Sequence, residues 1–223
     1  MKIARSGKEL LEICAAEQIS LSEYAIRQEM ALKNVSREDL FAQMKITLDA
    51  MKESATAGRE KKVYSLSGLI GGDAYRLQQY CNTGNSLMGN GIVMAMAISS
   101  SEVNGAMASG AVVELMGGTP KMSLDAAAII FKNVLGLVCD PVAGLVEIPC
   151  AKRNVSGAIN ALCTADMVMA GVNSKIPFDD AVAAMYKVGT GLPEELRETA
   201  LGGCAITPTG KALQEKVFGK KEN

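Results

Sequence analysis

The stretch Ser36-Arg37-Glu38-Asp39-Leu40-Phe41-Ala42-Gln43-Met44-Lys45-Ile46-Thr47-Leu48-Asp49-Ala50-Met51 decides the fold class of this chain. It opens on a serine followed by acidic residues, which is the pattern of a helix N-terminus. Apolar side chains then recur at the spacing of one helical face, at Leu40, Phe41, Met44, Leu48 and Met51. Gly58 is the predicted stop. The stretch therefore predicts an amphipathic helix.

The same start signal occurs twice nearer the N-terminus, at Ser6-Gly7-Lys8-Glu9 and at Ser20-Leu21-Ser22-Glu23. Further helices are predicted over residues 73–81, 91–100, 104–116, 122–135, 156–169, 178–188, 194–200 and 209–218. Alternating apolar runs are missing from the sequence, and only residues 145–148 could form a short extended segment. The predicted class is all-α, a multi-helix globular bundle.

Composition excludes several function classes. The 23 basic and 24 acidic residues give a net charge of −1, which provides no basic surface for nucleic acid or for an anionic membrane. The chain has no histidine, so a serine–histidine–aspartate triad cannot be built within it. Its 223 residues are enough for one domain with a substantial core.

Charges divide the chain into two parts. Residues 1–62 are rich in charge and predict amphipathic N-terminal helices, whereas residues 63–223 predict the main helical core. Between Leu77 and Pro120 only Glu102 and Glu114 are charged, so this stretch is expected inside the bundle or under a partner. A carboxylate buried there needs a polar partner or a raised pKa.

The compartment follows from the cysteines and the N-terminus. Six cysteines are dispersed over the chain rather than grouped as in a small disulfide-rich domain. The first residues lack the apolar segment of a signal peptide, and the uncharged residues 77–101 carry too many polar side chains for a membrane span. We therefore expect a reduced, cytoplasmic protein without a membrane partner.

Residues 136–154 carry the most informative chemistry, Gly-Leu-Val-Cys-Asp-Pro-Val-Ala-Gly-Leu-Val-Glu-Ile-Pro-Cys-Ala-Lys-Arg-Asn. Their glycines and prolines predict a loop between helices, with Cys139 and Cys150 in it. Lys152 and Arg153 follow directly, so soft metal ligands and positive charge that could hold a carboxylate occur together. The spacing is not a zinc pattern, and composition alone favours a structural role for both cysteines, as small buried apolar residues.

This block resembles the alpha subunit of iron–sulfur-dependent L-serine dehydratase, and the similarity extends from the first predicted helix to the C-terminus. Further stretches that carry the resemblance are Ser67–Ala74, Asn82–Gly89, Ser101–Asn104, Glu114–Pro120, Arg197–Thr199, Gly202-Gly203 and Thr207–Gly210.

The resemblance implies a 4Fe-4S cluster that is held by three cysteines and has one open iron, with the cluster loop between helices. Cys139 and Cys150 match two of the ligands, and Lys152, Arg153 and Asn154 match the motif that follows. The open iron would act as a Lewis acid on L-serine, which would give pyruvate and ammonia for amino-acid catabolism and gluconeogenesis. A separate beta subunit is implied as partner, and therefore a hetero-oligomer.

The chain departs from the family near residues 104–111. Family members carry a central segment there with a substrate loop and the first cluster cysteine, and both are absent from this sequence. The third cysteine ligand and the catalytic base are therefore not identified. A non-catalytic or truncated relative that keeps only scaffold and partner-binding roles is the alternative.

Two residues have competing interpretations. Asp73 follows Gly71-Gly72 and reads most simply as a helix N-cap, although the family match places it near the substrate. Cys163 reads as a buried helix residue.

Overall fold

The computed structural model describes residues 3–59 and 100–219, which form eight α-helices without a β-strand in those ranges. The prediction of an all-α bundle is confirmed. The α-helices are α1 (Gly7–Glu17), α2 (Leu21–Lys33), α3 (Arg37–Arg59), α5 (Ser100–Leu115), α6 (Pro120–Asn133), α7 (Cys150–Met169), α8 (Phe178–Gly191) and α9 (Pro208–Phe218). Three short 3₁₀ helices are η1 (Val142–Gly144), η2 (Glu194–Leu196) and η3 (Gly203–Ile206).

The three predicted start signals cap three helices. In each case the serine hydroxyl accepts a hydrogen bond from the backbone N–H three residues later, which satisfies a donor that the helix leaves free. These pairs are Ser6 with Glu9 at 3.1 Å, Ser20 with Glu23 at 3.2 Å, and Ser36 with Asp39 at 3.0 Å. Short-range sequence chemistry therefore fixes where α1, α2 and α3 begin.

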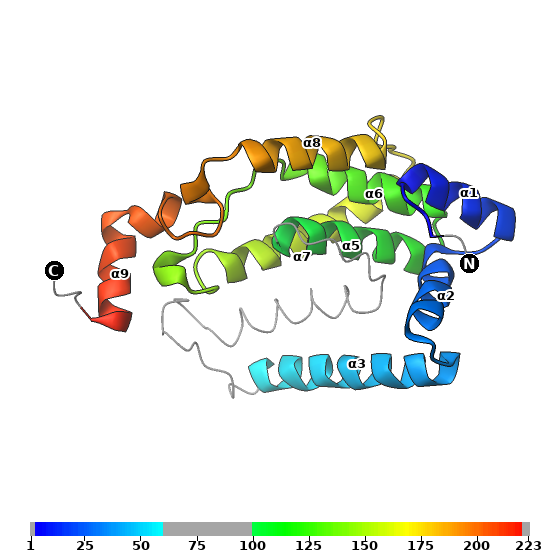
Figure 1. Ribbon diagram of the computed structural model, residues 1–223, viewed down its shortest axis with the longest axis horizontal. Helices are drawn as coiled ribbons and strands as arrows, with labels where there is room; N and C mark the ends of the chain where they lie inside the picture. The colour runs from blue at the N-terminus through cyan, green and yellow to red at the C-terminus, as the bar shows by residue number, and fades with distance from the viewer. Residues whose placement is uncertain (1–2, 60–99, 220–223) are drawn as a thin grey trace.

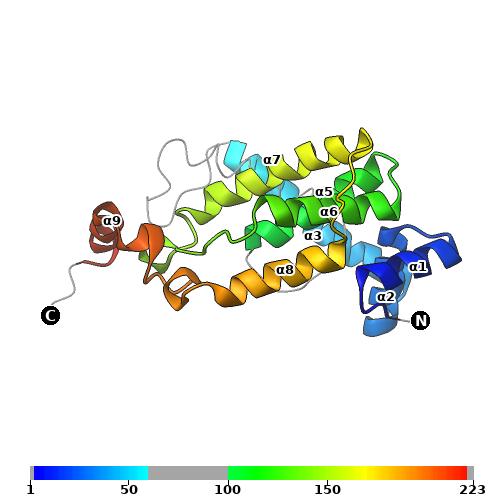
Figure 2. The same cartoon turned by 90° about the horizontal axis from the view of Figure 1, so that it is seen from above.

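Helix α6 is the centre of the bundle. It is buried over much of its surface, because apolar and small residues fill most of it and its charged residues are confined to Lys121, Asp125 and Lys132. Its buried residues are Ser123, Leu124, Ala126, Ala127, Ala128, Ile129, Ile130 and Phe131. One side packs with α5 and α7, another with α5 and α8, and its first turns with α1 and α2. Figures 1 and 2 show α5, α6, α7 and α8 side by side, with α1 at one end and α9 at the other.

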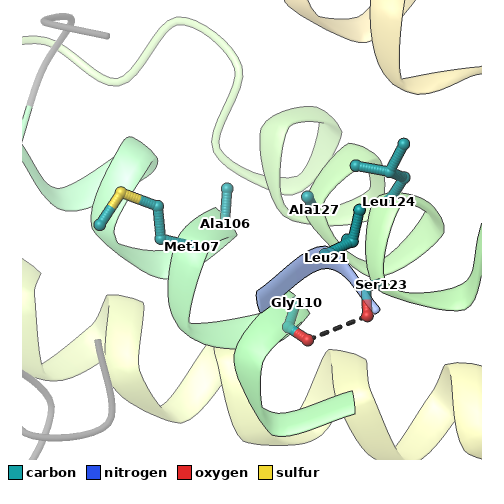
Figure 3. A pocket seen from close by; sticks show the side chains of 7 residues that line it. All are labelled: Leu21, Ala106, Met107, Gly110, Ser123, Leu124 and Ala127. Atoms are coloured by element: carbon teal, nitrogen blue, oxygen red, sulfur yellow. Dashed lines mark hydrogen bonds between the residues drawn. The ribbon is translucent and has the colours of Figure 1, made fainter. Parts of the chain in front are cut away.

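Small residues allow the central helices to approach closely. A Cβ at Gly105 of α5 would lie 3.3 Å from the backbone oxygen of Gly157 in α7 and 3.3 Å from Ile130 of α6. Nearby, the Ser123 hydroxyl donates to the carbonyl oxygen of Gly110 at 3.0 Å, as Figure 3 shows. The buried hydroxyl is therefore satisfied by the neighbouring helix.

Polar contacts attach the N-terminal helices to this core. The Asp179 carboxylate in α8 accepts from the backbone N–H groups of Gly7 at 2.6 Å and Lys8 at 3.0 Å, so it caps α1 from another element. Ser22 of α2 donates to the half-buried Glu114 of α5 through its N–H and its hydroxyl. The expectation that a carboxylate in this region needs a partner is met at Glu114.

Several predicted boundaries differ from the structure. Helix α7 begins at Cys150 rather than near residue 156, α3 passes Gly58 and reaches Arg59, and only residues 194–196 of the predicted helix 194–200 are helical, as a 3₁₀ turn. Residues 146–149 form a turn rather than an extended segment. The predicted helices 73–81 and 91–100 and the boundary at residue 62 lie outside the described residues, except for Ser100.

The apolar stripe predicted for α3 is only partly buried. Leu40 is buried where α3 packs against α2, whereas Phe41 and Met44 are exposed. The guanidinium of Arg37 lies over the Phe41 ring at 5.8 Å from its centroid. The helical periodicity was therefore a correct guide to helix formation and a poor guide to burial.

Candidate functional site

The loop with Cys139 and Cys150 lies at the end of the bundle where α6 ends and α7 begins. The segment after α8, with η2 and η3, packs on this loop, and α9 lies against η1 (Figures 1 and 2). The predicted placement between helices is correct for Cys139 and wrong for Cys150, which is the first residue of α7.

Cys139 is held through its backbone on both sides. Its N–H donates to the carbonyl oxygen of Leu196 at 2.9 Å, and its own carbonyl accepts from the N–H of Glu198 at 2.7 Å. These two bonds form an isolated parallel bridge between Cys139 and Arg197. The position of Cys139 therefore depends on a segment almost sixty residues further along the chain.

The two thiols occupy one electrostatic environment. Both are half-buried, and burial raises the pKa of the Cys139 and Cys150 thiols. Negative charge on Glu198 and Cys150 raises the pKa of Cys139 further, while the Arg153 guanidinium opposes the rise at both thiols. At neutral pH both thiols therefore favour the protonated form.

Asp140 is a buried charged residue beside Cys139. Its carboxylate is 2% exposed and accepts from Arg153 Nη1 at 2.7 Å and from the backbone N–H of Cys204 at 2.6 Å. Arg153 Nη1 also donates to the carbonyl oxygen of Val138 at 2.6 Å. Burial acts to raise the pKa of Asp140, but the bonds from Cys204 and Arg153 outweigh it and lower the pKa overall. The side chain is therefore ionised at neutral pH.

The backbone around these residues is unusual. Ala143, Glu198 and Ala200 have positive φ angles of 60°, 67° and 58°, in the left-handed region that L residues rarely adopt. Gly203 has a φ of 56°, and a Cβ on it would lie 2.3 Å from Asp140 Oδ2. Such conformations persist only where surrounding contacts enforce them, and they gather at functional sites.

The predicted substrate residues have different surroundings. Lys152 is exposed in the first turn of α7. The side chain of Arg153 is 22% exposed and engages Asp140, and Asn154 is half-buried. The Asn154 Oδ1 atom is buried and has no hydrogen-bond partner among the described residues. Asp73 lies outside the described part of the chain.

The other cysteines lie in different surroundings. Cys14 is buried among α1 and α2, and Cys81 lies outside the described residues. The prediction that Cys163 is buried is wrong, because its position on α7 faces outward and is exposed. Cys204 lies beside Asp140 and is exposed. Residues 3–59 and 100–219 contain no group of three histidine, cysteine, aspartate or glutamate side chains that could hold a metal ion.

Sequence reasoning did not single out Asp140, Glu198, Gly203 or Cys204 as members of this site. Asp140 was visible as the neighbour of Cys139, and Gly203 was visible as part of a glycine pair. Their contact across the loop could not be found from spacing, because it is formed by tertiary packing.

A small pocket elsewhere offers no comparable chemistry. It lies between α2, α5 and α6 and is mainly apolar (Figure 3). Its lining residues are Leu21, Ala106, Met107, Gly110, Ser123, Leu124 and Ala127. The only polar side chain among them, Ser123, is bonded to Gly110.

The fold and the loop define a class of protein, an all-helical bundle that holds two thiols at one end next to a buried ion pair. The family model described as serine dehydratase alpha chain matches residues 16–107 and 103–205. The chain therefore belongs to the serine dehydratase alpha-chain family. None of the described helices is long and apolar enough to cross a membrane.

Three relatives illustrate the similarity. The probable L-serine dehydratase alpha chain of Bacillus subtilis strain 168 is 39% identical over 96% of this chain and 95% of its own length. The L-serine dehydratase alpha chain of Peptoniphilus asaccharolyticus is 31% identical, with coverage of 94% and 96%. A probable L-serine dehydratase alpha chain of Latilactobacillus sakei is 57% identical over 52% of this chain and 55% of its own.

Proposed function

We propose that this chain is the alpha subunit of an L-serine dehydratase, which converts L-serine to pyruvate and ammonia. The observation that carries the proposal is the family membership of a chain that brings Cys139 and Cys150 into one environment. A beta subunit completes the enzyme in this proposal, in keeping with the alpha-chain names of the relatives. The reduced cytoplasm is the compartment that would keep these thiols available.

Cys139 and Cys150 would hold an iron–sulfur cluster as two of its thiolate ligands. Thiolates are the ligands of such clusters, so the donor type fits, and the further ligand would come from outside this pair. When bound, a 4Fe-4S cluster with one open iron supplies Lewis-acid assistance to departure of the serine hydroxyl.

The first turn of α7 provides groups for the rest of the substrate. Lys152 is an exposed cation, and the free N–H groups of a helix N-terminus also favour an anion, so both suit the substrate carboxylate. The buried acceptor on Asn154 suits a donor such as the substrate ammonium group. Arg153 contributes positive charge while its Nη1 remains on Asp140. Asp73 stays a predicted substrate contact.

The alternative is a relative that keeps the scaffold and its partner surface without catalysis. It is favoured by the way the family model matches in two pieces that meet at residues 103–107, because an intact member would match continuously. The alignment with the Bacillus subtilis relative spans 287 positions, more than the 223 residues of this chain, so residues of the relative lack counterparts here. These observations support a deletion near residues 104–111.

Anaerobic reconstitution distinguishes the two functions. The purified chain is incubated with iron and sulfide, with and without the beta subunit, and bound iron, bound sulfide and pyruvate formation from L-serine are measured. We expect iron binding by the wild-type chain and pyruvate only with the beta subunit. Cys139→Ser and Cys150→Ser should each lose most of the iron, because each removes a thiolate ligand.

Cys163→Ser is the matched control, since Cys163 is an exposed cysteine on the same helix as Cys150. It should keep the wild-type iron content. The non-catalytic alternative is established if the iron content is the same in Cys139→Ser, Cys150→Ser and the wild-type chain, and if no pyruvate forms with or without the beta subunit.

A further inference from the structure

Three chain segments meet at Asp140. The residue follows Cys139, its Oδ1 accepts from Arg153 in the first turn of α7, and its Oδ2 accepts from the N–H of Cys204. Because Arg153 lies three residues after Cys150, the ion pair ties the helical turn that starts with one cysteine to the residue next to the other. A single carboxylate therefore connects the backbones that carry both thiols.

Because Asp140 is buried, its carboxylate needs both of its hydrogen-bond donors. At 2% exposure the Asp140 carboxylate has no bulk water to replace a lost partner. Each oxygen accepts from a different donor, so an amide of the same shape could satisfy only one of them and would place its NH₂ against the other. Loss of one partner in a buried charged pair is costly because the remaining charge stays desolvated.

The neighbouring backbone is shaped around the same carboxylate. Gly203 has a φ of 56° and leaves no room for a side chain, because its Cβ would lie 2.3 Å from Asp140 Oδ2 and 2.7 Å from Asp140 Cβ. A substitution at Gly203 would therefore displace Asp140 without changing a charge or a thiol.

We propose that Asp140 is a positioning residue that sets the separation and orientation of the Cys139 and Cys150 thiols by clamping Arg153 and Cys204. The functional role of this positioning rests on the proposed function, in which both thiols bind one cluster. The geometry itself is tested without iron, sulfide or serine, so its failure is distinguishable from failure of the proposed function.

The sequence provides a direct assay. No lysine or arginine lies between Lys132 and Lys152, so trypsin releases one peptide, residues 133–152, that contains both Cys139 and Cys150. The reduced full-length chain is treated briefly with dibromobimane, which alkylates two nearby thiols, and is then digested. Mass spectrometry separates peptide bridged by one reagent from peptide labelled singly or twice. Monobromobimane gives the reactivity of each thiol on its own.

We expect efficient bridging in the wild-type chain and a bridging rate about tenfold lower, relative to the first alkylation, in Asp140→Asn, because misplacement of paired groups lowers their effective concentration. Gly203→Ala should show the same loss. The single-thiol rates with monobromobimane should change much less than bridging in both variants. Circular dichroism and thermal unfolding establish that each variant is folded.

Matched controls separate positioning from general destabilisation. Asp179→Asn alters a different carboxylate, whose two oxygens accept from the backbone N–H groups of Gly7 and Lys8. Asp179 lies at the start of α8, and the segment that contacts Cys139 follows the other end of that helix. Gly171→Ala places a side chain on another positive-φ glycine, with nothing within 4 Å of the new Cβ. Both controls should be less stable than wild type and should bridge at the wild-type ratio.

Two results would overturn the proposal. One is a folded Asp140→Asn chain that bridges at the wild-type ratio, and the other is an equal loss of bridging in Asp179→Asn. Where Asp140→Asn does not fold, Gly203→Ala decides the question in the same assay.

Discussion

At the scale of single residues, two aspartates each join separate segments of the chain, one in a buried and one in a half-buried position. Asp140 is buried and joins the cysteine loop to α7 and to Cys204, while Asp179 is half-buried and joins α8 to the first turn of α1. The Asp140 carboxylate accepts from the backbone N–H of Cys204 and from the Arg153 side chain, and the Asp179 carboxylate accepts from two backbone N–H groups. The contribution of each aspartate to stability depends on the donors that it contacts and not on its residue type. Asp180, the next residue in the chain, is also an aspartate but is exposed.

This difference predicts the cost of removing Asp179. Asp179→Ala should lower the free energy of unfolding by about 1–2 kcal/mol, because the N–H groups of Gly7 and Lys8 lose their acceptor. Asp180→Ala is the control from the same helical turn and should cost less than about 1 kcal/mol, the size of a helix-dipole effect. Urea unfolding at pH 7 measures both, and equal costs would show that the α1 cap contributes nothing specific.

At the scale of elements, α2 and α3 are joined by a charged contact at their N-terminal ends. Arg37 Nη2 lies 2.6 Å from each carboxylate oxygen of Glu23, and Arg27 Nε lies 2.7 Å from Oε1. The hydrogen bonds from Arg37 and then Arg27 lower the pKa of Glu23. This contact is largely open to solvent, so its contribution is modest and sensitive to salt.

Glu23→Gln should therefore reduce the stability of the chain in a pH-dependent way. A lowered pKa in the folded state stabilises the fold above the unfolded pKa of about 4.3, and this stability is lost as pH falls through the folded value. We expect a deficit of no more than about 1 kcal/mol at pH 7 that shrinks as the pH falls below about 4, measured by urea unfolding.

Glu53→Gln, at an exposed position of α3, should show no such trend. High salt should shrink the Glu23→Gln deficit at pH 7. A deficit that stays constant from pH 7 to pH 3 would attribute the effect to side-chain shape instead of charge.

At the scale of the whole molecule, close packing of α5, α6 and α7 holds the bundle together. Gly105 lies where α5 crosses α7, in contact distance of Gly157 and Ile130, whereas a Cβ at Gly189 in α8 would meet nothing within 4 Å. Both are helical glycines, so alanine brings the same gain in helix propensity at each. Only the packing differs.

Gly189→Ala should raise the free energy of unfolding by up to about 1 kcal/mol, because alanine restricts the unfolded chain and suits a helix. Gly105→Ala should show no gain and a net loss of about 1 kcal/mol or more, since the new methyl group forces tightly packed helices apart. Thermal and urea unfolding of the two variants test this. A gain of equal size at both positions would mean that the α5–α7 crossing tolerates extra volume.

The sequence predicted much of the helical framework and the part of the site that is local. The serine caps of α1, α2 and α3 were correct because a cap involves residues only three apart. The late predicted start of α7 was wrong because the glycines and prolines of residues 136–154 were read as loop as far as Asn154, whereas the helix begins at Cys150. Cys163 was misplaced because periodicity on α7 does not say which face its neighbours cover.

By itself the sequence determined the helical class, the starts of α1, α2 and α3, the loop position of Cys139 and the family resemblance, because each of these depends on residues close together along the chain. Tertiary structure alone decided that Asp140 meets Cys204 across 64 positions and that Asp179 caps Gly7 across 172. The physical reason is range. Capping and periodicity act within a few residues, whereas the partner of a buried charge is chosen by how whole helices pack.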